Sequence, residues 1–166
     1  MKLTRLIFPI LASAALCACG FTPANAPRTA DGSLAFKSIR VDNVKSGSII
    51  DDESGFYMAQ SLRKRLGTSG STHILEVTSK VGRAGLGVSG RDIASRYDLT
   101  MSTRYVLRDA KSGDVLDKGT VRSTSTFGSS VDPYARDATE NNSMRLVAAE
   151  NADRLLYKLA GYYAKK

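Results

Sequence analysis

Cysteine and histidine are scarce in this sequence. Of its 166 residues, only Cys17 and Cys19 are cysteines and only His73 is a histidine. A zinc site needs three or four suitable ligands at plausible spacing, and no such set is present in the sequence. No Cys/His or Ser/His/Asp signature for nucleophilic catalysis is present either. We therefore expect neither a metal centre nor an enzyme active site, and we interpret His73 as an exposed or hydrogen-bonded strand residue.

Long hydrophobic runs are also missing. The longest uncharged apolar stretch, residues 6–18, has thirteen residues, whereas a membrane-spanning helix needs about 20. A transmembrane anchor is therefore excluded. Lys2 and Arg5 precede the stretch and small residues end it, which is typical of a secretory signal peptide. We expect residues 1–18 to be removed, so that the mature chain begins at Cys19.

This cleavage changes the charge and the cysteine content of the chain. Removing eighteen residues from 166 leaves 148, and losing Lys2 and Arg5 lowers the net charge from +8 to +6. Because Cys17 is lost as well, Cys19 has no partner for a disulfide within the chain. It must remain a free thiol, pair between molecules or be modified chemically.

The residues around Cys19 favour chemical modification. The segment Leu16-Cys17-Ala18-Cys19-Gly20 resembles a bacterial lipobox, in which the cysteine is acylated and becomes the N-terminus. Each buried methylene contributes about 0.8 kcal/mol, so two or three acyl chains anchor a protein almost permanently. Glycine rather than aspartate at position 20 is, by the same resemblance, compatible with sorting to the outer membrane. The alternative is an ordinary signal peptide with a spare cysteine.

The rest of the chain has the composition of one globular domain. Hydrophobic residues make up 42% and charged residues 24% of the sequence, near the averages for soluble proteins. Residues 19–33 contain prolines and no periodic pattern, which predicts a lipidated N-terminal tether. We place a single domain at residues 34–166.

Hydrophobic spacing predicts four strands and two helices in this domain. Alternating patterns predict strands at 34–44, 73–81, 93–107 and 115–127. Four apolar residues at helical spacing predict a helix that begins near residue 51 and ends at Gly67: Phe56, Ala59, Leu62 and Leu66. Pro133 after Asp132 predicts the start of a long final helix. This order predicts an α+β fold, with two helices packed on one face of a four-stranded, mainly antiparallel (mixed) sheet.

A glycine-rich stretch at residues 82–90 contains a dinucleotide-binding string, GLGVSG. Such a string binds nucleotides where it follows a strand and opens a helix, because the helix N-terminus holds the pyrophosphate. The next predicted element here is a strand. We therefore predict a flexible loop between antiparallel strands and no nucleotide site.

Basic residues are the more useful lead. Arginines recur in and around the predicted strands, at Arg83, Arg91, Arg96, Arg104, Arg122 and Arg136. For an exported protein, phosphorylated lipopolysaccharide is a more accessible polyanion than nucleic acid. Guanidinium groups bind phosphate bidentately, which favours a phosphate-binding surface. The alternative is that arginines scattered on strands serve solubility and packing.

Together these features resemble the lipopolysaccharide-assembly lipoprotein family LptE, in its alphaproteobacterial form. The resemblance rests on the lipobox, the following residues Gly20-Phe21-Thr22-Pro23, the order of elements and the closing helix. It implies a non-enzymatic lipoprotein on the periplasmic side of the outer membrane. It further implies a 1:1 complex with the large β-barrel LptD, in which the protein is a plug, assists barrel assembly and binds lipopolysaccharide during delivery to the outer leaflet.

The resemblance also implies site residues. Cys19 carries the lipid, and no other cofactor or nucleic-acid partner is expected. Basic residues before the long third strand and at the start of the last helix contact lipopolysaccharide in this family. Arg91 and Arg136 occupy those places, with Arg83 and Arg96 as further candidates. The alternatives are a lipoprotein that binds another envelope component and a lipid-anchored hydrolase, although no convergent catalytic side chains support the latter.

Overall fold

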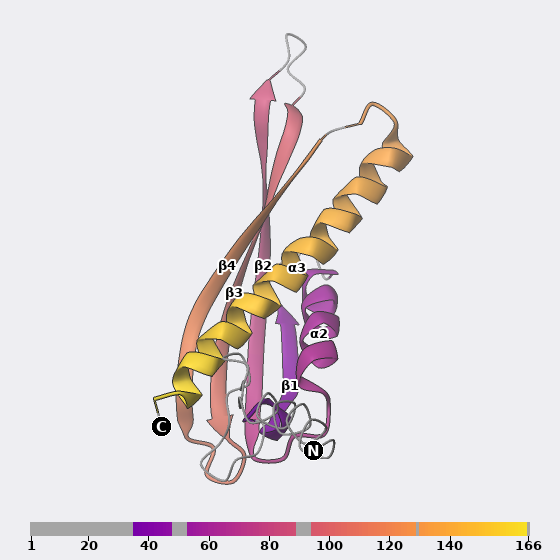
Figure 1. The fold of residues 1–166 in the computed structure, drawn as a ribbon. Coiled ribbons are helices and arrows are strands. Elements are labelled where there is room, and N and C mark those ends of the chain that lie inside the picture. Colours follow the sequence, from indigo (N-terminus) through magenta and orange to yellow (C-terminus); the bar gives the residue numbers. More distant parts are fainter. Residues whose placement is uncertain (1–34, 48–52, 89–93, 129, 166) are drawn as a thin grey trace, which may run out of the picture.

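The computed structural model describes residues 35–47, 53–88, 94–128 and 130–165 (Figure 1). The predictions for the signal peptide, the tether, Cys19 and Arg91 concern residues outside these ranges and stay predictions. In the part of the chain that is described, no helix is both long enough and apolar enough to cross a membrane.

Four strands form one mixed sheet in the order β1-β2-β3-β4. They are β1 (Ile39–Ser46), β2 (His73–Val88), β3 (Ala94–Asp109) and β4 (Val115–Gly128). β1 is parallel to β2, and the other two pairs are antiparallel. The helices α2 (Glu53–Leu66) and α3 (Pro133–Tyr163) cover one face of the sheet (Figure 1). The predicted α+β fold is confirmed. A short 3-10 helix, η1 (Ala35–Ser38), replaces the start of the first predicted strand.

The predicted loop at residues 82–90 is wrong for most of its length. β2 continues through the glycines to Val88, which pairs with Ala94 at the start of β3. Backbone pairing with the long β3 outweighs the low strand propensity of glycine. The next element in the described residues is a strand, as predicted, and not the helix that a dinucleotide-binding string requires.

The predicted buried face of α2 is confirmed for Ala59, Leu62 and Leu66 and is wrong for Phe56. Phe56 is 63% exposed, and Met58 is buried in the first half of the helix instead. Gly55 is buried beside Phe56 and packs closely on β1, because a Cβ there would lie 2.9 Å from the backbone nitrogen of Ser46. α2 therefore places Gly55, which has no side chain, against β1, and Phe56 lies on the exposed side of the helix.

The hydrophobic core lies between the helices and the covered face of the sheet. Large side chains without exposed surface come from β2, β3 and both helices and include Leu75, Leu99, Met101, Leu107, Leu62, Leu155 and Leu159. In α3 the buried stripe begins at Ser143, and Ala138 before it is exposed. The first turns of α3 therefore bury little apolar surface.

Buried polar groups join α3 to the sheet inside this core. The Asn151 amide nitrogen donates to the Met101 carbonyl and to the Ser123 hydroxyl oxygen, at 2.9 Å each. The Ser123 hydroxyl donates in turn to the Val147 carbonyl at 2.8 Å. Because unmade buried hydrogen bonds are costly, this network fixes the position of the helix along the sheet.

Local capping residues set the start of α3 and the end of α2. The Asp132 side chain accepts a hydrogen bond from the Tyr134 amide and caps α3, with Pro133 in the first turn as predicted. Gly67 ends α2 with a φ of 77°, which favours glycine.

An ion pair connects the two helices. Arg65 of α2 donates to the Asp153 carboxylate of α3 through Nε and Nη2.

Candidate functional site

Arg83 fastens the end of the β2–β3 hairpin to the beginning of α3. Its Nη1 donates to both carboxylate oxygens of Glu140, at 2.9 and 3.1 Å. The guanidinium also lies 5.1 Å from the centre of the Tyr97 ring, and Tyr97 stacks on Phe127. Arg83, which was predicted to contact phosphate, therefore has a structural role, because its guanidinium group already binds other residues of the protein.

Arg136 lies one helical turn before Glu140, so the ion pair of Arg83 stands beside the turn that carries Arg136. Arg96 lies between Leu86 and Gly128 in the register of the sheet. The structure thus brings three of the four arginines to one region, formed by the end of β2, the start of β3, the end of β4 and the first turns of α3. We call this region the distal end (Figure 1).

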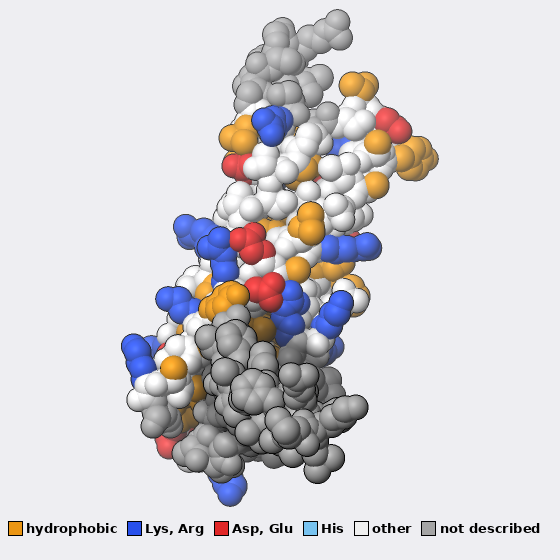
Figure 2. All heavy atoms as spheres, in the orientation of Figure 1, with side chains coloured by type: hydrophobic (Ala, Val, Ile, Leu, Met, Phe, Trp, Pro, Cys, Tyr) orange, Lys and Arg blue, Asp and Glu red, His pale blue; other side chains and the backbone are white. Residues whose placement is uncertain are grey.

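Exposed apolar side chains accompany the arginines at the distal end. Arg96 and Arg136 are both exposed. Val131 is fully exposed and Tyr134 is 87% exposed, just before Arg136 in the chain. Figure 2 shows hydrophobic side chains on the surface of this end. Apolar groups beside guanidinium groups suit an amphiphile with phosphates and acyl chains better than a purely polar anion.

A second basic surface follows the outer edge of β4. Two hollows of about 580 and 450 Å³ lie between β4 and the C-terminal half of α3, and they share Thr120, Tyr157 and Lys158. We call them together the lateral groove. Five basic residues and one acidic residue line it: Lys118, Arg122, Arg154, Lys158, Lys165 and Asp117. Figure 2 shows basic side chains gathered along this side of the molecule.

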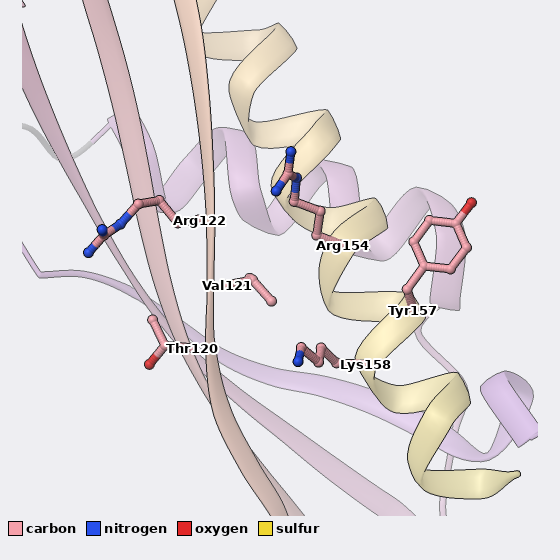
Figure 3. Close-up of a pocket in the computed structure, with 6 residues that line it drawn as sticks. All are labelled: Thr120, Val121, Arg122, Arg154, Tyr157 and Lys158. Carbon is pink, nitrogen blue, oxygen red and sulfur yellow. The ribbon is translucent and has the colours of Figure 1, made fainter.

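The side chains of β4 alternate between the two faces of the strand. In Figure 3, Val121 points toward α3, whereas Thr120 and Arg122 point to the opposite side of the strand. Arg154 and Lys158 stand on α3, one turn apart. Cations therefore flank the strand on both sides.

The lower part of the lateral groove contains a buried tyrosine. The Tyr105 hydroxyl donates to the Asp117 carboxylate at 2.9 Å. Burial, together with this hydrogen bond and the negative charge of Asp117, raises the pKa of Tyr105 to about 12. Asp117, the one acidic residue lining the groove, is therefore engaged with Tyr105.

His73 is a structural residue. Its Nδ1 lies within hydrogen-bond distance of the Ser38 hydroxyl, at 3.2 Å, and of the Tyr163 hydroxyl, at 3.0 Å. The prediction of a hydrogen-bonded strand histidine is confirmed. Across the described ranges, no three His, Cys, Asp or Glu side chains are grouped closely enough to hold a metal ion.

The sequence does not predict the lateral groove. The sequence shows only that Lys118 and Arg122 share one face of a strand and that Arg154 and Lys158 share one face of a helix. Strand order is not visible in a single sequence, however. Nothing in it indicates that β4 is an edge strand beside this face of the last helix.

Comparison with known proteins identifies a family for this chain. Residues 36–159, about three quarters of the chain, match the family LptE, described as lipopolysaccharide-assembly. No curated protein matches the sequence.

Solved structures of similar fold come from several bacteria. A lipoprotein from Caulobacter crescentus has a TM-score of 0.61 at 23% identity, over 79% of this chain and 94% of that one. The rare lipoprotein B from Shewanella oneidensis has a TM-score of 0.54 at 11% identity, over 76% and 96%. The minor lipoprotein from Acinetobacter baumannii has a TM-score of 0.55 at 13% identity, over 76% and 92%. At these identities the similarity establishes the fold, and the family match goes further: this chain belongs to the LptE family of lipopolysaccharide-assembly proteins.

Proposed function

We propose that this chain is an outer-membrane lipoprotein, anchored through acyl chains on Cys19, that acts as the 1:1 partner and plug of the LptD barrel. In this role it assists barrel assembly and the delivery of lipopolysaccharide to the outer leaflet. The observation that carries the proposal is the LptE family match over residues 36–159. The protein has no catalytic task in this proposal.

The uncovered face of the sheet supports the role of a plug. It is rich in hydroxyl groups, such as Thr100 and Thr124, whose side-chain oxygens lie 3.0 Å apart. Thr126 donates to the Asp98 carboxylate on the same face. The lumen of a large outer-membrane barrel is polar, so a plug needs a lateral surface that is polar as well.

The distal end supports contact with lipopolysaccharide. We propose that Arg136, Arg96 and Arg91 bind its phosphates, and that Val131 and Tyr134 contact its apolar part. Arg136 and Arg96 are exposed, and the two apolar side chains are exposed beside them. Arg83 positions the turn that carries Arg136 through its ion pair with Glu140.

Depletion of the protein in its own host tests this function. We expect less mature, oxidised LptD and less lipopolysaccharide at the cell surface. Re-expression of the wild-type chain should restore both, whereas a Cys19→Ser variant, which cannot be acylated, should not. Unchanged levels of both after depletion would contradict the proposal.

A pull-down in detergent separates the two binding roles. We expect mass spectrometry to identify LptD as the dominant partner, in an amount equimolar with this protein. Another envelope component as the dominant partner would instead support the alternative role of a binding lipoprotein.

A further inference from the structure

The outer edge of β4 is long and regular. After a single irregularity opposite Leu107 and Arg108, the strand pairs with β3 without interruption from Asp117 to Gly128. No other strand of the described ranges pairs with its outer edge. β1, at the other edge of the sheet, differs because a bulge between Val41 and Asn43 interrupts it. Bulges blunt an edge strand, whereas a regular edge can accept another strand.

The lateral groove follows this edge. Residues 117–122 of β4 line it, which corresponds to about 20 Å of extended chain at about 3.3 Å a residue. The opposite wall is α3, which contributes Tyr157 with 63% of its surface exposed. A long, open groove beside unpaired backbone groups fits an extended polypeptide better than a small molecule.

The charges of the groove decide the kind of occupant. Lys118 and Arg122 stand on one side of β4, and Arg154 and Lys158 on the other. Arg154 is bound to Glu150, but the described residues give Arg122 and Lys158 no salt bridge. A strand added here would place alternate side chains beside each of these pairs, so acidic side chains on either face would meet a cation.

The same charges argue against a second copy of this chain. Pairing of β4 with β4 would bring the two sets of basic side chains together, and like charges across a strand pair are destabilising. They also argue against a basic or apolar peptide, which would leave the cations of the groove without a counter-charge.

We propose that the outer edge of β4 binds an extended, acidic segment of a partner protein, which adds to the sheet as a fifth strand. Backbone hydrogen bonds supply affinity, and Arg122 and Lys158 select for carboxylates on the two sides of the added strand. This site is separate from the distal end, and its existence does not depend on lipopolysaccharide binding.

Synthetic peptides and the full chain, purified in detergent, test the proposal. The probe is a fluorescein-labelled peptide of eight residues in which pairs of glutamates alternate with pairs of valines, so that carboxylates lie on both faces of the extended peptide. A lysine-for-glutamate peptide tests charge. A peptide with the same side chains but N-methylated backbone amides tests strand pairing, because it retains the carboxylates and loses the donors. Fluorescence anisotropy measures affinity, and amide hydrogen exchange locates the bound peptide.

We expect the acidic peptide to bind and to slow exchange in residues 117–124. N-methylation, the lysine peptide and the double variant Arg122→Glu/Lys158→Glu should each weaken binding at least tenfold. Lys111→Glu, the same charge change in the exposed β3–β4 turn, should leave binding unchanged. Equal binding of the N-methylated peptide would overturn the proposal, since the groove would then attract carboxylates without pairing. Absence of binding at millimolar peptide, or protection confined to residues outside β4, would overturn it as well.

Discussion

The ring of Tyr105 lies over Gly119, its cross-strand neighbour on β4. A Cβ at position 119 would lie 3.0 Å from both the Tyr105 hydroxyl oxygen and a ring carbon. The glycine therefore leaves space for the ring to cross the edge strand and for its hydroxyl to reach Asp117. An aromatic ring placed over a glycine also restores the packing that the glycine lacks.

Substitution at Gly119 should therefore displace Tyr105. We expect Gly119→Val to lower the free energy of unfolding by about 1–3 kcal/mol, because the ring must move and its hydrogen bond is lost. Urea denaturation measures the change. Gly82→Val is the control, since a Cβ at position 82 has no neighbour within 4 Å. Equal effects of the two substitutions would show that the contact with Tyr105 is unimportant.

Two buried tyrosines should make the fold sensitive to high pH. Burial raises the pKa of Tyr105 and of Tyr163 to about 12 each, from 10.0. Between these values the unfolded chain releases protons that the folded chain retains, so stability is complete below about pH 10 and falls as the pH rises toward 12. The loss should approach about 3 kcal/mol for each tyrosine above pH 12, because the pKa rises from 10.0 to about 12 and each unit corresponds to about 1.4 kcal/mol.

The double variant Tyr105→Phe/Tyr163→Phe tests this origin. Its unfolding free energy, measured in urea at pH 9 and pH 11.5, should fall less between the two pH values than that of the wild type. Tyr134→Phe removes an exposed hydroxyl and should behave as the wild type does. The interpretation fails if the double variant loses as much stability as the wild type.

Asn151 should be necessary for the docking of α3. We expect Asn151→Ala to cost about 2–4 kcal/mol, because it creates a cavity and leaves the Met101 carbonyl without the amide donor. Thermal and urea unfolding measure the loss. Asn142→Ala changes an exposed residue of the same helix and should cost little. A similar loss in both variants would remove Asn151 from its proposed role.

Arg136 should contribute to lipopolysaccharide binding without affecting the complex with LptD. Charge reversal in Arg136→Asp should weaken binding of purified lipopolysaccharide about tenfold, or about 1.4 kcal/mol, because a phosphate contact becomes a repulsion. Co-purification with LptD should be unchanged. Lys111→Asp is the matched control at the opposite end of the β3–β4 hairpin. Equal affinity of the Arg136 variant and the wild type would exclude Arg136 from the site.

Much of the fold follows from the sequence because local signals agree with the tertiary structure. The alternation from Leu75 to Ser79 and the cap at Asp132 both correspond to what the structure shows. The errors arose where contacts with distant residues decide the outcome. The first turn of α2 packs on β1 through Gly55 rather than Phe56, and β3 extends β2 through glycines that locally favour a loop.

The candidate site was predictable to a smaller extent. Arg83, Arg96 and Arg136 were identified by residue type and family resemblance, and the structure brings them to one end of the molecule. It does not follow from the sequence that Arg83 is bound to Glu140, because the two are far apart in the chain. The lateral groove depends on strand order, which no local pattern reveals.

The parallel pairing of β1 with β2 has a consequence for the order of folding. β2, β3 and β4 are consecutive antiparallel strands, whereas Ile39 of β1 must wait for His73 of β2 and for the intervening α2. Such non-local contacts form late because closing the loop costs entropy. We therefore expect β1, although it precedes the other strands in the chain, to pair last. During that interval we expect the exposed charges of Arg40, Asp42 and Lys45 to disfavour pairing of the free strand with a neighbouring chain.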